Sequence, residues 1–539
     1  MMEQQWILLS DVRVPFDADD NVIWEKATEK MKRAGISAPP LLFRLYKKSF
    51  DARKRPAILA VCSVLLAYAP TVRLTEKALK AAGAKVYRDP PIRPGQGSEP
   101  LHHRPLVVGM GPAGMFCALL LAENGYAPIL IDRGDDVAGR VRAVENFYAT
   151  GVLDTRSNIQ FGAGGAGTFS DGKLITRVGD EKCGYVLRRF AEFGAPEEIT
   201  TQARPHIGTD ILRDVVHNIL THIEACGGEL RYRTCLEEIR EWPDGSVSAV
   251  TDRGEIPCGC IVLAPGHSAR DTYAMLLGKG YAVEPKPFSV GVRVEHLQAD
   301  IDRILYGELA GHPKLPTGEY SQSDTTGERG VYTFCMCPGG EVMAAASEEG
   351  GVVVNGMSRH ARDGINANSA VAVSIFREDY GNTPQGAIEY QRTLERAAFR
   401  MGGEDYTAPA QTMGDFLAGK RGTEPSRVLP SYRGGKVKLC DLGEVLPAYV
   451  TESLRRGFRS FDRRMPGYIA PDTMLTGVET RTSAPVRLLR GESMTALGHD
   501  RVYPCGEGAG YAGGITSAAV DGLRAALALM ARFAPPKQI

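Results

Sequence analysis

The chain has 539 residues, of which 43% are hydrophobic and 24% charged, proportions that exclude a disordered or membrane-embedded class. A chain of this length suggests about two to four domains. Basic and acidic residues number 64 each, so the formal net charge is zero and bulk charge gives no argument for nucleic acid or an anionic membrane as a partner.

The cysteines and the apolar stretches indicate a cytoplasmic protein. The 11 cysteines are scattered, without a C-x-x-C motif or zinc-type spacing, so we interpret them as reduced thiols and expect no metal site. A charged and then apolar leader is absent, so a secretory signal is not expected. The longest apolar stretch, residues 57–69, is too short to span a bilayer, and we expect no membrane partner.

Residues 1–90 alternate between strand and helix patterns. Both expected helices end at a glycine, Gly35 or Gly83, where a helix C-cap favours this residue. The order strand, helix, strand, strand, helix, strand predicts a ferredoxin-like α+β domain. Residues 91–103 are rich in proline and glycine and are interpreted as a linker. The expected strands are 5–14, 41–50, 57–68 and 84–88, and the expected helices lie near 22–34 and 73–83.

A basic stretch at residues 44–55 interleaves cationic and aromatic side chains. On a ferredoxin-like fold such a strand invites an RNA-binding interpretation. The RNP1 pattern is missing, however, and the net charge is zero, so a solvated basic face is the better interpretation. The expectation is therefore against a nucleic-acid partner.

The next unit opens with the strand, turn and helix of a dinucleotide site. In VVGMGPAG, Gly109 permits the tight turn, Gly111 lets the backbone approach a pyrophosphate, and Gly114 lets helix and strand pack closely. The helix start then offers free N–H groups to the phosphates. Asp132 ends the second strand, where an acid accepts hydrogen bonds from ribose hydroxyls.

A second G-x-G-x-x-G lies in FGAGGAGTFSDGKL, residues 161–174. The preceding residues hold no apolar run that could form a buried parallel strand, and the following ones start a helix poorly. We therefore reject a second nucleotide-binding turn. Because glycine lets backbone approach a ligand closely, we expect this loop to cover the cofactor, with a glycine-rich surface loop as the alternative.

The middle of the chain, residues 285 to about 480, combines hairpins with helix-rich stretches. In VYTFCMC, the alternating pattern places Cys335 and Cys337 on one strand face. Residues two apart in a strand lie at the edge of the Cα range for a disulfide, so two small buried residues is the favoured interpretation. The polar stretch that contains Ser358 and Arg359 predicts either an anion-recognising site or a solvated loop.

The last strand, RVYPCGEG, leads through a glycine turn into a helix at about 514–532. Together with the first glycine turn and the strand IVLAPGHS, this pattern resembles the two-dinucleotide-binding-domain flavoproteins, whose FAD domain is assembled from both ends of the chain. Five further stretches are similar to the large bacterial family of uncharacterised FAD-dependent dehydrogenases. These are FGAGGAGTFSDGKL, FCMCPGGEV, AAASEEGGVVVNGMS, ARDGINANSAVAVS and CGEGAGYAGGITSAAVDG.

The resemblance implies FAD, with the first turn on the pyrophosphate and Asp132 on the adenosine ribose. No His or Cys near the first turn demands a covalent link, so we expect the FAD to be non-covalent. The resemblance places Glu507 near the ribitol, and it aims the backbone of residues 513–516 at the flavin. Because the chain shows no second nucleotide domain, NAD(P)H is possible as an electron donor only if it docks transiently, and the alternative is another donor. The cofactor-binding residues so expected are Gly109, Gly111, Pro112, Ala113, Gly114, Asp132, Arg133, Arg140, Gly164, Gly165, Gly167, Thr168, Gly266, Gly506, Glu507, Gly513, Gly514 and Ile515.

These observations predict an α/β protein with a Rossmann-like FAD-binding domain split by an inserted α+β domain. The expected divisions are a ferredoxin-like domain (1–90), a linker (91–103), the first part of the FAD domain (104–284), the insertion (285–480) and the return (481–539). The expected function is hydride exchange between flavin and a small molecule bound between the FAD domain and the insertion. The candidates for catalysis are His267, Ser358, Arg359 and Arg481.

Two other functions remain open from the sequence. One is a flavoprotein that acts on RNA, as in tRNA modification, with residues 1–90 as the binding region. The other is a non-catalytic FAD-binding sensor or interaction protein, which predicts a flavin that no physiological donor reduces at a useful rate.

Overall fold

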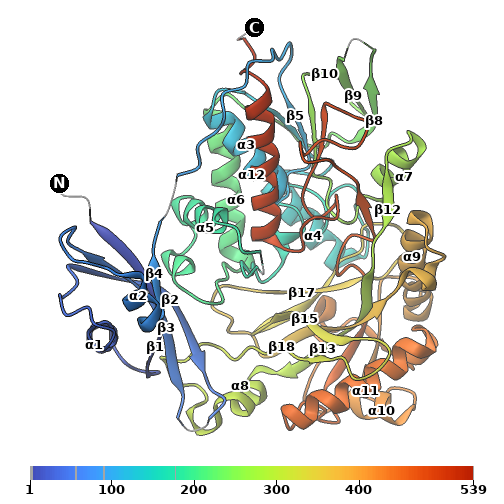
Figure 1. The fold of residues 1–539 in the computed structure, drawn as a ribbon. Coiled ribbons are helices and arrows are strands. Elements are labelled where there is room, and N and C mark those ends of the chain that lie inside the picture. The colour runs from blue at the N-terminus through green and yellow to red at the C-terminus, as the bar shows by residue number, and fades with distance from the viewer. Residues whose placement is uncertain (1–3, 55–56, 89–90, 177, 244, 538–539) are drawn as a thin grey trace.

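The structure is a computed structural model that describes residues 4–54, 57–88, 91–176, 178–243 and 245–537. Its N-terminal unit, blue in Figure 1, lies at one side of the molecule. Six elements build this unit in chain order: β1 (Gln5–Pro15), α1 (Asp20–Arg33), β2 (Leu42–Asp51), β3 (Leu59–Tyr68), α2 (Glu76–Ala82) and β4 (Ala84–Val86). The strands form an antiparallel sheet in the order β2-β3-β1-β4. The predicted succession of strands and helices is therefore confirmed.

Local signals set the ends of these helices. The side chain of Asp19 accepts a hydrogen bond from the Val22 N–H and so caps α1. Gly83 ends α2 in the left-handed conformation, as the sequence predicts. The expected domain boundary at residue 90 and the end of the basic stretch at residue 55 lie outside the described residues.

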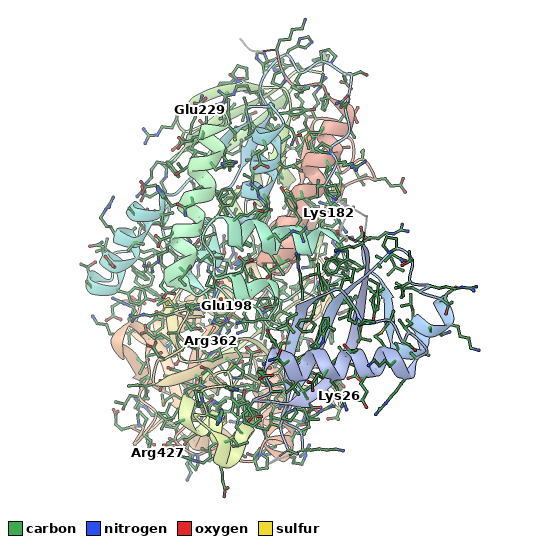
Figure 2. The ribbon with its side chains drawn as sticks, turned by 90° about the vertical axis from the view of Figure 1, so that its left-hand side faces the viewer. Lys26, Lys182, Glu198, Glu229, Arg362 and Arg427 are labelled. Carbon is green, nitrogen blue, oxygen red and sulfur yellow. The ribbon has the colours of Figure 1, made fainter. Side chains whose placement is uncertain are left out.

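The N-terminal unit docks on the segment that follows α5 (Lys182–Glu192). The main chain of Lys48 donates to the carbonyl of Thr201 and accepts from the N–H of Ala203, at 2.8 and 2.9 Å. In Figure 2, Lys26 marks this unit, which lies beside the segment that carries Glu198.

A five-stranded parallel sheet forms the centre of the second unit. Four of its strands lie before the third unit in the sequence, and the fifth lies after it. The strands are β5 (Leu106–Val108), β6 (Ile129–Ile131), β7 (Glu229–Arg231), β11 (Ile261–Leu263) and β23 (Val502–Pro504). Their order is β23-β11-β5-β6-β7, and every pairing is parallel. The Rossmann-like arrangement and the return of the chain into it at β23 agree with the sequence prediction.

Both faces of this sheet are covered, as its four buried strands, β5, β6, β11 and β23, require; β7, at the edge, is partly exposed. One face packs against α3 (Pro112–Glu123), α6 (Thr209–Ala225) and α12 (Ile515–Arg532), which Figure 1 shows side by side. The other face packs against a small antiparallel sheet of β8 (Leu236–Glu241), β9 (Val247–Thr251) and β10 (Gly254–Cys258). The unit also contains α4 (Val137–Thr150) and α7 (Arg270–Gly278).

The third unit is built on a seven-stranded sheet in the order β14-β15-β18-β13-β21-β19-β20. Its strands are β13 (Phe288–Leu297), β14 (Ser323–Asp324), β15 (Val331–Cys337), β18 (Asn366–Ile375), β19 (Ala408–Thr412), β20 (Val437–Leu439) and β21 (Met474–Glu479). The β19–β20 pairing is parallel and the others are antiparallel. A separate hairpin pairs β16 (Gly340–Ala344) with β17 (Val354–Ser358). The helices are α8 (Gln298–Tyr306), α9 (Pro384–Gly402), α10 (Met413–Ala418) and α11 (Ala448–Arg464).

The chain enters and leaves this third unit through one pair of strands. β12 (Val283–Pro285) pairs antiparallel with β22 (Val486–Leu488) and brings Pro285 opposite Val486. The two crossings between the second and third units therefore lie next to each other. Over the described ranges, no helix is both long and apolar enough to cross a membrane.

Candidate functional site

The first glycine turn follows β5 and leads directly into α3. Gly109 has a φ of +103°, and a β-carbon there would lie 2.2 Å from the carbonyl oxygen of Ala264. A β-carbon on Gly114 would lie 1.8 Å from the carbonyl oxygen of Gly109. Both positions therefore exclude a side chain. The turn brings the unpaired N–H groups of the first turn of α3 to the carboxyl edge of the sheet.

Asp132 is fixed beside this turn by the backbone. Its carboxylate accepts hydrogen bonds from the N–H groups of Met110 and Gly134, at 2.9 and 2.8 Å. The next residue, Arg133, donates two hydrogen bonds of 2.9 Å to Asp271, and its guanidinium lies 4.4 Å from the ring centre of Phe161. Asp132 therefore has a fixed orientation, while Arg133 already holds a charged partner.

The loop 161–174 lies on the first glycine turn. The N–H of Gly164 donates to the carbonyl of Met110 at 2.8 Å, and a β-carbon on Gly165 would lie 2.8 Å from the α-carbon of Gly111. Within the described residues no strand occurs between α4 and β7, so no strand leads into this loop. The rejection of a second strand-turn-helix nucleotide site is thus confirmed.

Arg140 holds this loop from behind. Its side chain is fully buried and donates to four carbonyl oxygens, those of Asn158, Ile159, Ala163 and Gly165, at 2.6–2.8 Å. Burial lowers the pKa of Arg140 to about 9, so the guanidinium remains charged at neutral pH. The structure thus places Arg140 under the loop rather than in the cavity that the loop covers.

The C-terminal turn brings a second helix start to the same place. Gly514 is the N-cap of α12, and Gly513 and Gly514 both face open space. Glu507 follows β23 by three residues, and its carboxyl group has no hydrogen bond or ion pair among the described residues. Burial, opposed by Lys286, raises the pKa of Glu507 to about 7. The site therefore contains a carboxyl group that titrates near neutrality.

These segments enclose a cavity of about 290 Å³. One wall comes from the two glycine turns and the loop, and the other from β15, β17 and β21 of the third unit. The predicted site residues that line it are Gly109, Gly111, Pro112, Ala113, Asp132, Gly165, Gly167, Gly266, His267, Arg481, Gly506, Glu507, Gly513, Gly514 and Ile515.

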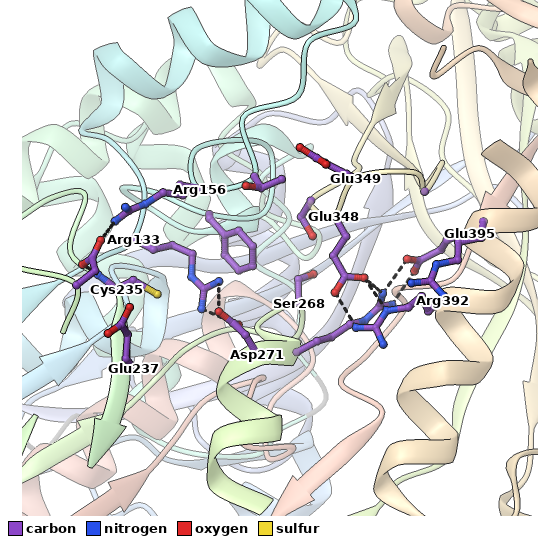
Figure 3. Close-up of a pocket in the computed structure, with 17 residues that line it drawn as sticks. Arg133, Arg156, Cys235, Glu237, Ser268, Asp271, Glu348, Glu349, Arg392 and Glu395 are labelled. Carbon is purple, nitrogen blue, oxygen red and sulfur yellow. Dashed lines mark hydrogen bonds and ion pairs between the residues drawn. The ribbon is translucent and has the colours of Figure 1, made fainter. Parts of the chain in front are cut away.

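A second, charged cavity of about 580 Å³ adjoins the first at Phe161 and Ser268. Figure 3 shows two ion pairs among the residues that line this space, Arg133 with Asp271 and Glu348 with Arg392. A small gap between the two cavities is lined by Asp132, Arg133 and Cys235, among others. The space along the carboxyl edge of the sheet thus continues past Asp132, away from α12.

FAD fits this arrangement. The glycine turn before α3 leaves room for phosphates where any β-carbon would clash, and Asp132 presents a fixed carboxylate beside it. A second helix start, at Gly514, lines the far end of the cavity with backbone groups. Two positive helix ends in one cavity suit an elongated anionic dinucleotide. Among the described residues no group of three or more His, Cys, Asp or Glu side chains could hold a metal ion.

Two of the four catalytic candidates lie in the cavity wall. Burial and then repulsion by Arg481 lower the pKa of His267 to about 3, so the imidazole is neutral; its Nδ1 lies 2.9 Å from the hydroxyl oxygen of Ser268. Arg481 donates two hydrogen bonds to the buried Glu395, at 3.1 and 3.0 Å. Glu395 also receives two hydrogen bonds of 2.8 Å from Arg270. Both candidates are therefore held in fixed positions.

The other two candidates do not reach the cavity. Ser358 is buried and donates to the carboxylate of Asp171, which itself lines the cavity. Arg359 is exposed, because the chain turns outward after β17, so the expectation that it faces the site is wrong. Five predicted cofactor residues also lie outside the wall: Gly114 at the turn–helix contact, Gly164 and Thr168 within the loop, Arg140 beneath it, and Arg133, which lines the adjoining charged cavity.

Sequence reasoning missed Asn355 and Glu479 and treated Cys335 as a structural residue, whereas it offered Asp171 and Lys173 as candidates for flavin or substrate contacts. Asn355 and Glu479 line the cavity from β17 and β21, and Cys335 lines it from β15. Asp171 accepts a 2.7 Å hydrogen bond from Lys173, which also lines the cavity. The order of strands within the seven-stranded sheet brings these residues together, and no local motif signals that order.

Comparison with known proteins shows that the sequence is similar to FAD-dependent and NAD(P)-binding proteins. Residues 287–482 match the family model of the FAD-dependent protein, C-terminal domain-like, and residues 107–170 match that of the NAD(P)-binding Rossmann-like domain. An uncharacterised protein of Clostridium beijerinckii is 44% identical over 540 residues, covering 98% of this chain and 100% of that protein. The aklavinone 12-hydroxylase DnrF of Streptomyces peucetius is 31% identical over 161 residues, which cover 28% of this chain and 31% of the hydroxylase.

Among solved structures, a single-residue mutant of the halogenase PltM in complex with FAD has a TM-score of 0.39 at 12% identity, covering 80% of this chain and 70% of that one. The structure of CtdE in complex with FAD has a TM-score of 0.33 at 11% identity, covering 80% and 84%.

Proposed function

Since the chain belongs to the family of FAD-dependent proteins that includes the Clostridium beijerinckii protein, we propose that it is an oxidoreductase of the dehydrogenase type. Its substrate is a small molecule bound between the Rossmann-like unit and the third unit. One observation carries the proposal: the cavity opened by the two glycine turns is closed by polar side chains of the third unit. A cofactor held on the first wall therefore faces groups that can orient a substrate.

We further propose that residues 1–90 form a ferredoxin-like domain and that residues 285–480 are inserted into the FAD-binding domain. The strand order β2-β3-β1-β4 supports the first assignment. The pairing of β12 with β22 supports the second, because the chain leaves and re-enters the Rossmann-like unit at one place.

FAD, when bound, supplies two-electron chemistry as hydride exchange. The protein supplies the orientation. Backbone N–H groups at the start of α3 bind the pyrophosphate, and Asp132 accepts hydrogen bonds from the adenosine ribose. The start of α12, at Gly514, lines the cavity, and its positive end would stabilise negative charge on the reduced ring.

The opposite wall binds the substrate. Lys173, on the loop 161–174, reaches this wall by donating to the carbonyl of Met336, and it stays protonated because attraction by Asp171 outweighs the effect of burial and raises its pKa. Asn355 and Glu479 add amide and carboxyl groups at the same wall. Glu507, whose pKa is about 7, is the group suited to exchange a proton at neutral pH, whereas the neutral His267 acts as a hydrogen-bonding and positioning group.

An anaerobic titration tests the proposal. The FAD-loaded protein is titrated with NADPH and then with NADH while the visible flavin absorption is recorded. Rapid bleaching supports a dehydrogenase that takes a transiently docked nicotinamide, and candidate substrates are then screened for recovery of the absorption. Bands that neither nicotinamide bleaches would exclude this donor and favour a non-catalytic role. A protein without flavin absorption after reconstitution with FAD would contradict the proposal.

A further inference from the structure

The strand β15 is irregular at its end, where Cys335 and Cys337 lie. Its pairing with β18 shifts register between Phe334 and Cys337, and Cys335 has a φ of +44°. In a regular strand, residues two apart are separated by about 6.6 Å, at the edge of the range for a disulfide. Here the bulge brings the two sulfur atoms to 3.9 Å from each other. The alternating sequence pattern favours two structural residues, because a regular strand would separate the two cysteines. The strand is not regular here, so that reason does not apply.

The pair lies at the wall of the FAD cavity. Cys335 lines the cavity together with Gly513, Gly514 and Glu507, while Cys337 is fully buried behind it. Cys335 therefore borders the space in which FAD would bind, and its sulfur is in contact with that of Cys337. This is the arrangement of an attacking and a resolving thiol.

Two cations hold the backbone of the pair. The guanidinium of Arg293 donates to the carbonyl of Cys335 at 2.7 Å and lies 4.0 Å from the sulfur of Cys337. Lys173 donates to the carbonyl of Met336, between the two cysteines. The thiol of Cys337, together with Arg293 and Lys173 and against the effect of burial, lowers the pKa of Cys335 to about 5. A thiolate at this position is the reactive form of cysteine.

The chain contains a second C-x-C segment that lacks all these features. Cys258 is the last residue of β10, and Cys260 lies two residues later, before β11; both are buried, and neither lines the cavity. Burial raises the pKa of Cys258 to about 12. Cys258 is therefore a matched control for the spacing alone.

We propose that Cys335 and Cys337 form a reversible dithiol–disulfide couple that exchanges two electrons with FAD bound in the same cavity. In the oxidising direction the S–H bond of Cys337 breaks and an S–S bond forms between its sulfur and the thiolate of Cys335. The two electrons and the proton of Cys337 pass to FAD, which becomes the reduced anion, so no further proton is released. The reverse step reduces the disulfide and reoxidises the flavin. This activity goes beyond the proposed function, because it requires bound FAD but no external small-molecule substrate.

The state of both thiols can be read from one peptide. Trypsin releases residues 330–359 as a single fragment, whose only cysteines are Cys335 and Cys337. The FAD-loaded protein is reduced with dithionite under argon, reoxidised in air, denatured in an alkylating reagent and analysed by mass spectrometry. We expect two alkylated cysteines before reoxidation, and afterwards a fragment two hydrogens lighter without alkylation. Cys258→Ala should give the same result. Two alkylated cysteines after reoxidation would overturn the proposal.

A reductive titration gives an independent measurement. The oxidised wild-type protein should consume twice as many dithionite equivalents per FAD as Cys335→Ser or Cys337→Ser, because only the wild type carries a disulfide in addition to the flavin. Equal consumption by all three proteins would overturn the proposal. A failure of NAD(P)H to reduce the flavin would leave both thiol measurements unchanged, so the two proposals fail separately.

Discussion

Gly165 packs so closely on Gly111 that a β-carbon on Gly165 would lie 2.8 Å from the α-carbon of Gly111. The contact joins the loop 161–174 to the phosphate-binding turn, and both segments line the same cavity. The width of the cavity at this point therefore depends on the absence of a side chain at Gly165.

Gly165→Ala should weaken FAD binding at least about tenfold, which corresponds to about 1.4 kcal/mol. The methyl group would push the loop away from the turn. Gly381→Ala is the control, because Gly381 also has a positive φ, +71°, but faces open space. Isothermal titration of the FAD-free chain with FAD measures both variants. If both variants lost FAD affinity equally, the cause would be backbone strain and not the contact between Gly165 and Gly111.

Arg140→Met should destabilise the protein by about 3 kcal/mol, because four buried carbonyl oxygens lose their charged donor. Urea unfolding of wild type and variant measures this difference. Arg142→Ala, an exposed position on the same helix, should change stability by less than about 0.5 kcal/mol. A fully stable Arg140→Met variant would show that the loop keeps its position without the guanidinium.

Glu507→Gln should flatten the dependence of stability on pH. Burial raises the pKa of Glu507 from its ordinary value near 4.5 to about 7, so the folded protein holds this proton more tightly than the unfolded chain. Stability should therefore fall as the pH rises from about 5 to about 7, by about 1–3 kcal/mol, and then level off. Unfolding of the FAD-free full chain at pH 5 and pH 8 measures the effect. An unchanged pH dependence in the variant would mean that another group titrates.

Glu395→Gln should destabilise the protein by about 3–5 kcal/mol, because the buried Arg481 would lose its countercharge and Arg270 would keep only Glu348. Burial opposes ionisation of Glu395, but Arg270 and Arg481 outweigh it and hold its pKa well below the usual range. Its contribution is therefore present at neutral pH and is lost only in acid. Glu389→Gln, an exposed ion-pair position on the same helix, provides the comparison in thermal unfolding. Equal losses of stability in the two variants would indicate that burial of the Glu395 ion pairs adds nothing to their contribution to stability.

Local sequence signals were sufficient to predict those parts of the site whose contacts are made between residues close in the sequence. Gly109 and Gly114 sit in a strand-turn-helix unit whose geometry permits only glycine, and Asp132 follows the next strand at the expected distance. The rejection of a second nucleotide site at residues 161–174 rested on the missing strand, and the described residues between α4 and β7 contain none. In each case the determining contacts are made within one turn or one βαβ unit.

The sequence by itself determined the order of the elements, the Rossmann-like turn and the return of the chain at its C-terminal end. Only the tertiary structure decided that Arg140 supports the loop from beneath, that Arg359 faces solvent, and that Cys335 reaches the FAD cavity. The physical reason is the range of the interactions involved. Backbone conformation and helix ends depend on neighbouring residues, whereas a cavity wall depends on which distant strands pair and on where a bulge redirects a side chain.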